Sequence, residues 1–396
     1  MIDIPRIQAT LRENRLDGWL LYDFRGSNAL ARRILGLDGR GMSSRRLLYW
    51  IPAQGEPRKL VHRIESAALD DLPGSKLVYL PWQQFEEGVA SLVSGSGRIA
   101  MEYAPRNSNP YVSRVDAGTV ELVRSLGVEV VSSGDLIQQF EATWSEDQWR
   151  MHCEAAKHTD SAYTRAWAFI AERVRRDGQV METTVQQVIM DHFTQHGLVF
   201  DHGPIVGVNA HSGDPHFETC PASDQPIRAG DLVLIDLWAK VNQPDAVYSD
   251  LTRMAVVDTA AQPRHAEVFD IVCRARDAAI EAVRSAFASG TPIPGWQVDD
   301  AARRVIEQSG YGAYFIHRTG HSIGQEVHGN GANMDNLEMH DERRILPCTC
   351  FSVEPGIYLP EFGMRSEVDV YVGHDGRVHV TGGSPQTALM PILAAF

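Results

Sequence analysis

The chain has 396 residues, of which 43% are hydrophobic and 22% are charged, and its net charge is −14. This length exceeds that of one ordinary core and predicts two domains, while the composition is typical of a soluble globular protein. The acidic balance argues against nucleic acid as a partner. The longest apolar runs are far shorter than the ~20 residues that span a bilayer, so we expect no membrane partner.

The N-terminus and the cysteines favour a cytoplasmic location. No basic region followed by an apolar core occurs in MIDIPRIQATLRENR, so this stretch does not resemble a secretory signal. The five cysteines are odd in number and scattered, and they imply no disulfide framework. We therefore expect reduced thiols.

The N-terminal domain, residues 1–140, is predicted to be α/β because strand-like and helix-like segments alternate along it. Strands are expected at Gly18–Phe24, Leu47–Pro52, Lys59–Arg63, Lys76–Pro81, Arg98–Ala104 and Val128–Val131. Helices are expected at Pro5–Asn14, Trp82–Val93 and Ala117–Leu126. The boundary to the second domain, residues 141–396, falls within residues 132–144.

The second domain is predicted to consist of two similar halves. Ser145 to Gln148 has the form of a capping box that opens a long helix. A second helix, Thr183–Gln195, and then strands follow it. The same order recurs with helices at Pro263–Ala288 and Val298–Gln308, followed by strands. A sheet built from both halves would bring acidic residues of one half towards those of the other.

Two acidic residues lie inside apolar strands of the first half. Leu232–Val257 reads as two strands joined by a polar connection, with Asp236 in the first strand and Asp250 in the second. Either aspartate alone is explained by a turn cap or an exposed edge. Buried and facing each other, two carboxylates repel, and a cation between them removes the repulsion. The pair therefore favours a metal site.

The second half offers three more candidate ligands, each with an ordinary alternative. His321 lies in Thr319–Gly324, where glycines let the backbone approach a ligand closely, although a lone histidine usually has a structural role. Glu354 ends an apolar strand before a Pro-Gly turn, and Glu367 lies in a strand that by itself reads as half-exposed. Asp369, on the same face, is interpreted as solvated or as a support to the ligands.

Four carboxylates and one imidazole form a hard, oxygen-rich ligand set. Such a set suits manganese, with cobalt, zinc or iron as alternatives, better than a structural zinc site. Because four carboxylates carry more charge than one divalent ion neutralises, we expect two divalent ions. A water molecule shared by two such ions loses its proton near neutral pH and attacks a carbonyl, so the set predicts metal-assisted hydrolysis.

The ordered series IDLWAK, YSDLTR, TGHSIGQEVH, SVEPGIY and MRSEVDV resembles the metallopeptidase family of prolidase, Xaa-Pro aminopeptidase and methionine aminopeptidase. The resemblance covers about residues 145–393. It implies a catalytic domain with the pita-bread fold and its pseudo-two-fold symmetry. The N-terminal domain resembles that of the prolidase and creatinase branch, where it takes part in dimerisation and active-site closure, so a homodimer is expected.

The resemblance also implies roles at matching positions. Asp236 binds one metal ion, Asp250 and Glu367 bridge both, His321 binds the other ion, and Glu354 binds there and takes part in proton transfer. The remaining matched residues contact the substrate or its scissile bond, and they are His216, His317, His328 and Arg365. One departure is that Asp236 and Asp250 lie three residues farther apart than is usual in prolidases, which is expected to reshape the pocket rim and spare the metals.

The implied activity is hydrolysis of the bond before proline in small peptides with proline in second position. An Xaa-Pro dipeptidase is the first interpretation and an Xaa-Pro aminopeptidase the alternative. A dipeptidase needs a cation for the free carboxylate of the proline. Arg365 is one candidate, and Arg40, Arg45 or Arg46 in the basic loop 37–46 is another, although a solvated loop also explains them.

Three other activities fit the sequence less well. The segment Gly320–Gly324 satisfies GxSxG, but a serine-hydrolase elbow needs a helix after Ser322, and GQEVHGNG is a poor helix. A creatinase-like enzyme uses no metal, and the presence of all five ligand positions argues against it. A metal-dependent lyase of the same fold uses metal ligands of the same kind, so the ligands alone do not distinguish it from a peptidase.

Overall fold

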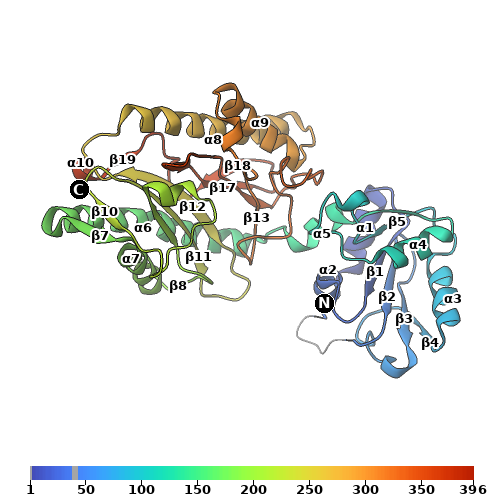
Figure 1. The fold of residues 1–396 in the computed structure, drawn as a ribbon. Helices are drawn as coiled ribbons and strands as arrows, with labels where there is room; N and C mark the ends of the chain where they lie inside the picture. Colours follow the sequence, from blue (N-terminus) through green and yellow to red (C-terminus); the bar gives the residue numbers. More distant parts are fainter. Residues whose placement is uncertain (1, 38–42) are drawn as a thin grey trace. The chain divides into compact units, whose positions relative to one another are not determined.

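The structure is a computed structural model that describes residues 2–37 and 43–396 (Figure 1). It divides into two compact units, Met1–Glu141 and Ala142–Phe396, called the N-terminal and C-terminal units below. In the part of the chain that is described, no helix has the length and apolarity needed to cross a membrane.

The N-terminal unit is a mixed sheet with helices on both faces (Figure 1). Its strands, in the order β4-β3-β2-β1-β5-β6, are β1 (Gly18–Asp23), β2 (Leu47–Pro52), β3 (Arg58–His62), β4 (Ser75–Tyr79), β5 (Arg98–Met101) and β6 (Glu129–Ser132). Its helices are α1 (Ile4–Glu13), α2 (Ala29–Ile34), α3 (Trp82–Val93), α4 (Ala117–Ser125) and α5 (Gly134–Glu141).

The central strand β1 explains why this sheet is covered on both sides. Successive side chains of a strand point to opposite faces, and here Trp19 and Leu21 join one apolar cluster, with α1, α2 and α5. Leu20 and Tyr22 join the other cluster, with α3 and α4. All six residues of β1 are buried, as expected for a strand between two helical layers.

The C-terminal unit repeats one sequence of elements. Its helices are α6 (Glu146–Asp177), α7 (Glu182–Gln195), α8 (Pro263–Ser289), α9 (Gly295–Gln308) and α10 (Ile392–Ala395). A helix of 32 residues and one of 14 precede the strands of the first half, and helices of 27 and 14 residues precede those of the second. Each pair packs over its own apolar core, so the two halves have similar architecture.

Two antiparallel strand pairs form the centre of these halves. β11 pairs with β12 in the first half, and β14 pairs with β17 in the second. The first-half strands are β7 (Gln179–Met181), β8 (Leu198–Val199), β9 (Ile205–Val208), β10 (Pro226–Arg228), β11 (Leu232–Val241) and β12 (Ser249–Val256). The later strands are β13 (Ser322–Ile323), β14 (Cys350–Val353), β15 (Gly356–Tyr358), β16 (Gly363–Arg365), β17 (Val368–Val372), β18 (Val378–Thr381) and β19 (Met390–Pro391).

The two halves are joined where β12 meets the start of β17. The N–H of Glu367 donates to the carbonyl of Thr252 at 3.1 Å, and Ser249 Oγ donates to the Asp369 carboxylate at 2.9 Å. The acidic residues of the two halves are therefore brought together, as expected from the sequence. This junction positions the candidate site.

Most predicted elements are confirmed, and the differences have local causes. The capping box at Ser145 and Gln148 is present, and β2 and α3 have the predicted bounds. The expected boundary segment instead contains α5, whose Leu136 and Ile137 are buried in the N-terminal unit. Asn28 caps the short helix α2, which the sequence analysis omitted.

Candidate metal centre

The first-half hairpin presents its two aspartates on one face. Asp236 lies opposite Thr252, and Trp238 lies opposite Asp250, so all four side chains share the same side of the pleat. Asp250 is 5% exposed and Thr252 is fully buried. The hairpin predicted around the two acids is confirmed.

The second half brings its candidates from three chain segments. His321 directly precedes β13, Glu354 follows β14, and Glu367 lies between β16 and β17. A Cβ at Gly320 would lie 2.0 Å from the Ser352 carbonyl oxygen. Gly320 therefore lets the backbone before His321 pack closely against β14. The sequence analysis expected the glycines to allow close approach to a ligand, whereas this contact is with the protein's own backbone.

Three of the five predicted ligands converge. Ligand atoms of Asp250, His321 and Glu367 all lie within 4.8 Å of one another. His321 Nε2 is 3.5 Å from Asp250 Oδ2 and 3.4 Å from Glu354 Oε1. Asp236 is not part of this convergent group, and its Oδ2 accepts a hydrogen bond of 2.5 Å from Arg365 Nη2.

The cluster is strongly anionic for a buried site. Burial, followed by the Asp236 and Glu354 carboxylates, raises the pKa of Asp250 well above its usual value. Burial, followed by Asp250 and Glu354, does the same to the pKa of Glu367. Burial also raises the pKa of Asp236, although Arg365 opposes this shift. The Arg365 guanidinium opposes these three shifts but does not offset them.

Glu354 is the exception among the four carboxyls. Burial alone would raise its pKa, but His321, His317 and Arg365 lower it below the ordinary value. Ser352 Oγ also donates a hydrogen bond to Glu354 Oε1 at 3.1 Å. Glu354 is thus the carboxyl of the cluster that the surroundings favour as a carboxylate.

Arg365 links the carboxylates to a tyrosine and a histidine. Its Nε donates to Thr252 Oγ1 at 3.0 Å, and its Nη1 donates to the Tyr358 hydroxyl at 3.4 Å. The Tyr358 hydroxyl in turn lies 2.7 Å from His317 Nε2. Burial lowers the pKa of His317 to about 4. Tyr358 lies in a motif that the sequence analysis quoted without assigning it a role.

His328 and His216 have different surroundings. The His328 ring lies edge-on to His321 with 4.3 Å between centroids, and His321, followed by burial, lowers the pKa of His328 to about 4. His216 is exposed on the loop after β9, and its N–H donates to Asp214 Oδ1. Among the described contacts, none connects the His216 side chain with the cluster.

The arginines of the basic loop belong to the N-terminal unit. The Arg45 N–H donates to Glu65 Oε2 at 3.2 Å. The Arg46 guanidinium carbon lies 3.7 Å from the centroid of the Phe85 ring, which is a cation–π contact. Arg40 lies outside the described residues. Binding of a substrate carboxylate by these arginines stays a prediction.

Asp369 corrects the interpretation of its strand. All of β17 is buried, and Asp369 is fully buried, so it is not solvated and Glu367 is not on a half-exposed strand. Asp369 accepts from the Asp250 N–H at 3.2 Å and from Ser249 Oγ. His152 Nε2 lies 3.8 Å from Asp369 Oδ2. Nothing in the helical spacing of α6 distinguishes His152 from a core residue.

The serine-hydrolase alternative lacks its structural context. Ser322 lies in β13, and bends without any helix follow it over residues 324–330. The Ser322 hydroxyl accepts a hydrogen bond from the Gly331 N–H at 3.0 Å. Because a nucleophile elbow needs a helix directly after the serine, Ser322 is a structural residue of this loop.

Comparison with known proteins now identifies the family. The model of metallopeptidase family M24 matches residues 150–374. The chain belongs to this family. The chain is 28% identical over 347 residues to the "Probable dipeptidase PepE" of Mycobacterium tuberculosis, covering 86% of this chain and 85% of that protein. It is 35% identical to the Xaa-Pro dipeptidase of Pyrococcus furiosus over 161 residues, 40% of this chain and 42% of that protein.

Solved structures show the same fold over almost the whole chain. The dipeptidase PepE of Mycobacterium ulcerans superimposes with a TM-score of 0.66 at 24% identity, covering 98% of this chain and 96% of that chain. The prolidase of Thermococcus sibiricus gives a TM-score of 0.59 at 23% identity, covering 98% and 97%. The M24 member thus has an N-terminal α/β domain followed by a pita-bread domain, as predicted.

The metallopeptidase family implies bound metal, and the residues of the cluster fit a divalent cation. Asp236 Oδ1 is buried and has no hydrogen-bond partner among the described residues. With all four carboxyls ionised, as ligation would require, the Arg365 guanidinium would leave a net charge of about −3, more than one divalent ion neutralises. Imidazole and carboxylate are ligands that first-row divalent ions accept.

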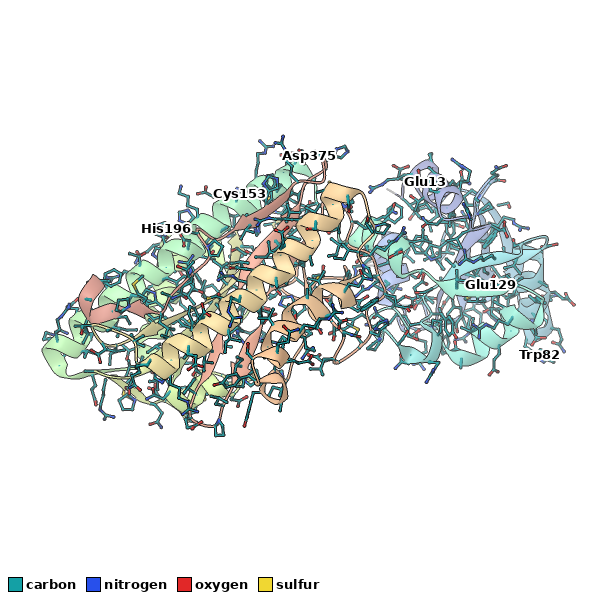
Figure 2. All side chains as sticks on the ribbon, turned by 90° about the horizontal axis from the view of Figure 1, so that it is seen from above. Glu13, Trp82, Glu129, Cys153, His196 and Asp375 are labelled. Atoms are coloured by element: carbon teal, nitrogen blue, oxygen red, sulfur yellow. The ribbon has the colours of Figure 1, made fainter. Side chains whose placement is uncertain are left out.

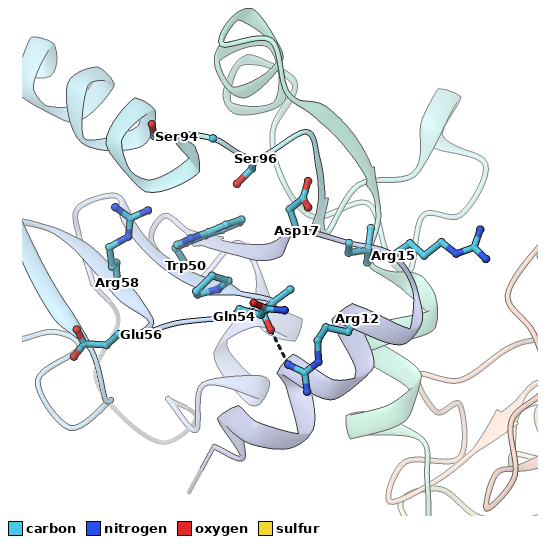
Figure 3. Close-up of a pocket in the computed structure, with 13 residues that line it drawn as sticks. Arg12, Arg15, Asp17, Trp50, Gln54, Glu56, Arg58, Ser94 and Ser96 are labelled. Carbon is cyan, nitrogen blue, oxygen red and sulfur yellow. Dashed lines mark hydrogen bonds between the residues drawn. The ribbon is translucent and has the colours of Figure 1, made fainter.

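Two other cavities contain none of the predicted site residues. One of about 680 Å³ lies in the N-terminal unit, lined by Arg12, Asp17, Trp50 and Arg58 among others (Figure 3). The second, of about 550 Å³, lies between the start of α6 and the β11–β12 connection. At this connection, Gln148 Nε2 donates to the Asp245 carbonyl.

Proposed function

We propose that this M24 member is a metal-dependent exopeptidase that hydrolyses the Xaa-Pro bond of dipeptides. The observation that carries the proposal is the convergence of Asp250, His321 and Glu367 within 4.8 Å, beside Asp236 and Glu354. The five residue types and their positions match those that the resemblance assigns to the metal ligands of this family.

Two divalent ions, preferably Mn²⁺, would be held at this centre. Asp236 would hold one ion, His321 and Glu354 the other, and Asp250 and Glu367 both. Such ions act as Lewis acids that activate water and polarise the peptide carbonyl. The hard ligand set favours manganese, while cobalt, zinc and iron remain compatible with it.

The chain's own residues would bind the peptide and move protons. Glu354 is kept ionised by His321, His317 and Arg365, so it can accept a proton and pass it to the leaving amine. His328 stays neutral beside His321, which suits a hydrogen bond to the peptide around the scissile bond. His216 lies on an exposed loop, from which it would contact the substrate.

Dipeptides are the preferred substrate class because the relatives named above are called dipeptidases. An Xaa-Pro aminopeptidase is the alternative, since the enzyme of that name from Thermotoga maritima shares the fold with a TM-score of 0.55 at 21% identity, covering 96% of this chain and 99% of that chain. A creatinase-like amidinohydrolase is disfavoured by the complete ligand set, and a lyase of the same fold by the dipeptidase relatives.

One assay separates these possibilities. Ala-Pro, Ala-Pro-Ala and Ala-Ala are supplied to the manganese-loaded enzyme, and the products are separated. Cleavage of Ala-Pro alone supports the dipeptidase, and cleavage of Ala-Pro-Ala to Ala and Pro-Ala supports the aminopeptidase. Cleavage of Ala-Ala as fast as Ala-Pro contradicts proline specificity, and cleavage of none of the three contradicts the proposed activity.

Selection of a dipeptide requires a cation for its carboxylate, and Arg45 or Arg46 would supply it. Replacing either by Ala should lower kcat/KM for Ala-Pro. The fall should correspond to a loss of ~1.5–3 kcal/mol of transition-state stabilisation, the scale of one charge-assisted hydrogen bond. A tripeptide should be affected less. Equal effects on both substrates, or none, would remove this loop from the mechanism.

We also propose a homodimer and a cytoplasmic location. Strand β4 is the outer strand of its sheet, and it exposes Leu77 and Val78 near Trp82, which is 61% exposed. Such an edge is a natural site for association with a second copy. All five cysteines are free thiols, which suits a reducing compartment.

A further inference from the structure

Three histidines gather on the surface of the C-terminal unit, on helices α6 and α7, which pack against each other. His192 lies in the last turn of α7 and His196 caps its end, so the two are i, i+4 neighbours on one helix face. The His196 ring centroid lies 4.2 Å from that of His192 and 4.5 Å from that of His158 on α6.

The cluster is accessible to solvent. His196 is exposed, and His158 and His192 are partly exposed. Figure 2 shows His196 among the outer side chains of the C-terminal unit. A small ion can therefore reach all three rings, and none of the three histidines takes part in the candidate metal centre.

The hydrogen bonds determine which ring nitrogens carry protons. His196 Nδ1–H donates to the His192 carbonyl at 2.8 Å, and His158 Nε2–H donates to Glu154 Oε1 at 2.9 Å. The Ser161 hydroxyl donates its single hydrogen to the His158 carbonyl at 3.0 Å. Its oxygen must then accept from His192 Nε2–H, which lies 2.9 Å away.

Each ring is left with one nitrogen that bears a lone pair: Nδ1 of His158, Nδ1 of His192 and Nε2 of His196. Among the described residues, the hydrogen bonds of these rings to side chains and to the His192 carbonyl are made through the other nitrogens, and the His192 ring is also hydrogen-bonded to the His158 backbone. Histidines that bind metals commonly have this arrangement, in which the other N–H donates to a carboxylate, carbonyl or similar oxygen that fixes the ring. Burial, followed by His196, lowers the pKa of His192, which favours the neutral, ligating form.

We infer that His158, His192 and His196 form a second metal site, distinct from the peptidase centre, for a borderline divalent ion such as Ni²⁺ or Zn²⁺. Three imidazoles are a ligand set that these ions prefer over Mn²⁺ or Mg²⁺. Glu154, whose side chain is 54% exposed, adds negative charge beside the site, and Arg165 on α6 adds the opposing charge. A bound ion would join the end of α7 to α6.

Binding requires rotation of the side chains, and the His196 ring would then exchange its hydrogen bond to the His192 carbonyl for a bond to the ion. Among the described residues, ligand atoms converge within 4.8 Å only at Asp250, His321 and Glu367, so the three lone pairs do not yet point to a common centre. Exposed side chains change rotamer within picoseconds to nanoseconds, and His196 is such a side chain. The three histidine side chains would close around the ion as it binds.

The test is calorimetric titration of the untagged, manganese-loaded enzyme with Ni²⁺. Wild type is compared with His158→Gln, His192→Gln and His196→Gln, and with His374→Gln, which removes an exposed histidine outside the cluster. Each cluster variant should lose one equivalent of Ni²⁺ or bind it at least about tenfold more weakly. The His374 variant should match wild type, and the peptidase activity of all variants should be retained.

Residue-specific modification gives a second measurement on the unaltered chain. Ni²⁺ should protect the three histidines from diethyl pyrocarbonate, as mapped by mass spectrometry, and leave His374 reactive. Wild-type stoichiometry and affinity in the three cluster variants would overturn the inference. The inference would also be overturned if Ni²⁺ binding were lost in the His192 and His196 variants but kept in His158→Gln. The ion would then be bound by two histidines of α7 alone.

Discussion

Asp250 is held through its backbone as well as through its neighbours. Its N–H donates to Asp369, which is fully buried beside the equally buried His152. Carboxylates that support a metal ligand in this way commonly affect metal affinity by roughly 10–100-fold. The geometry of the centre therefore depends on residues that would not themselves touch metal.

Replacing a bridging carboxylate tests the ligand assignment. In Asp250→Ala or Glu367→Ala, metal content and peptidase activity should be lost together, because each carboxylate would hold both ions. In His328→Ala, metal content should stay at the wild-type level while the rate falls by roughly a hundredfold, the scale of one lost transition-state contact. Elemental analysis beside a rate assay measures both. Loss of metal in the His328 variant would show that His328 is a ligand.

His152 predicts a specific dependence of stability on pH. Burial lowers its pKa from 6.5 to about 4, so the unfolded chain takes up a proton more readily than the folded chain. Stability should be intact above pH ~6.5 and fall as the pH drops towards 4, by on the order of 3 kcal/mol from this group. Denaturant titrations at several pH values give the free energy of unfolding of wild type and of His152→Gln. Between pH 6.5 and 4 this free energy should fall more steeply with decreasing pH in wild type than in the variant. If the two free energies changed in parallel with pH, the lowered pKa of His152 would be contradicted.

At the residue scale, the sequence predicted the acids and left Asp369 open between solvation and support of the ligands, and its hydrogen bonds to Ser249 and Asp250 fit the second alternative. Asp236 and Asp250 are recognisable because a carboxylate within an apolar strand needs a partner. Asp369 has the same signal, but alternation alone cannot tell a buried face from a solvated one when a strand is covered on both sides. The Arg365–Asp236 contact joins residues far apart in sequence and could not be predicted from spacing.

At the scale of elements, local signals determine where helix α6 begins and ends. The Ser145 side chain accepts from the Gln148 N–H at 3.2 Å, and Gln148 Oε1 accepts from the Ser145 N–H at 2.9 Å. At the other end, Gly178 adopts a left-handed conformation with φ 79°, which suits a residue without a Cβ. These signals lie within a few residues and are therefore visible in the sequence.

Removal of the cap should weaken α6 measurably. Ser145→Ala should lower the free energy of unfolding of the C-terminal unit by about 1 kcal/mol, because one N–H of the first turn loses its acceptor. Ser285→Ala, on an exposed face of α8, serves as the control and should change this free energy by less than ~0.5 kcal/mol. A Ser145 variant as stable as wild type would show that the cap does not contribute.

Elements whose stability comes from tertiary packing were harder to predict. Helix α5 has eight residues, too few for a strong periodic pattern, and it is stabilised by the core it covers. Strand β17 reads as half-exposed because its Asp369 is polar, although this side chain faces the junction with β12. In both cases the deciding contacts are made by segments distant in sequence.

At the scale of the whole molecule, the exposed apolar edge of the N-terminal unit predicts self-association. The double variant Val78→Lys and Trp82→Arg should shift the protein from dimer to monomer in light scattering, since it places charges on the proposed interface. Figure 2 shows Trp82 at the surface of this unit. Leu126→Glu, at another exposed site, should leave the dimer intact. A wild-type monomer with full activity would contradict the proposed dimer.

The central claim is that a metal centre at the junction of the two halves hydrolyses the bond before proline. The most direct measurement is Ala-Pro hydrolysis by the enzyme after exhaustive chelation and again after addition of Mn²⁺, with metal content determined at both stages. The account predicts that chelation abolishes hydrolysis, that manganese restores it, and that a serine-directed inhibitor has no effect. Full activity in protein shown by elemental analysis to contain no metal would contradict the account.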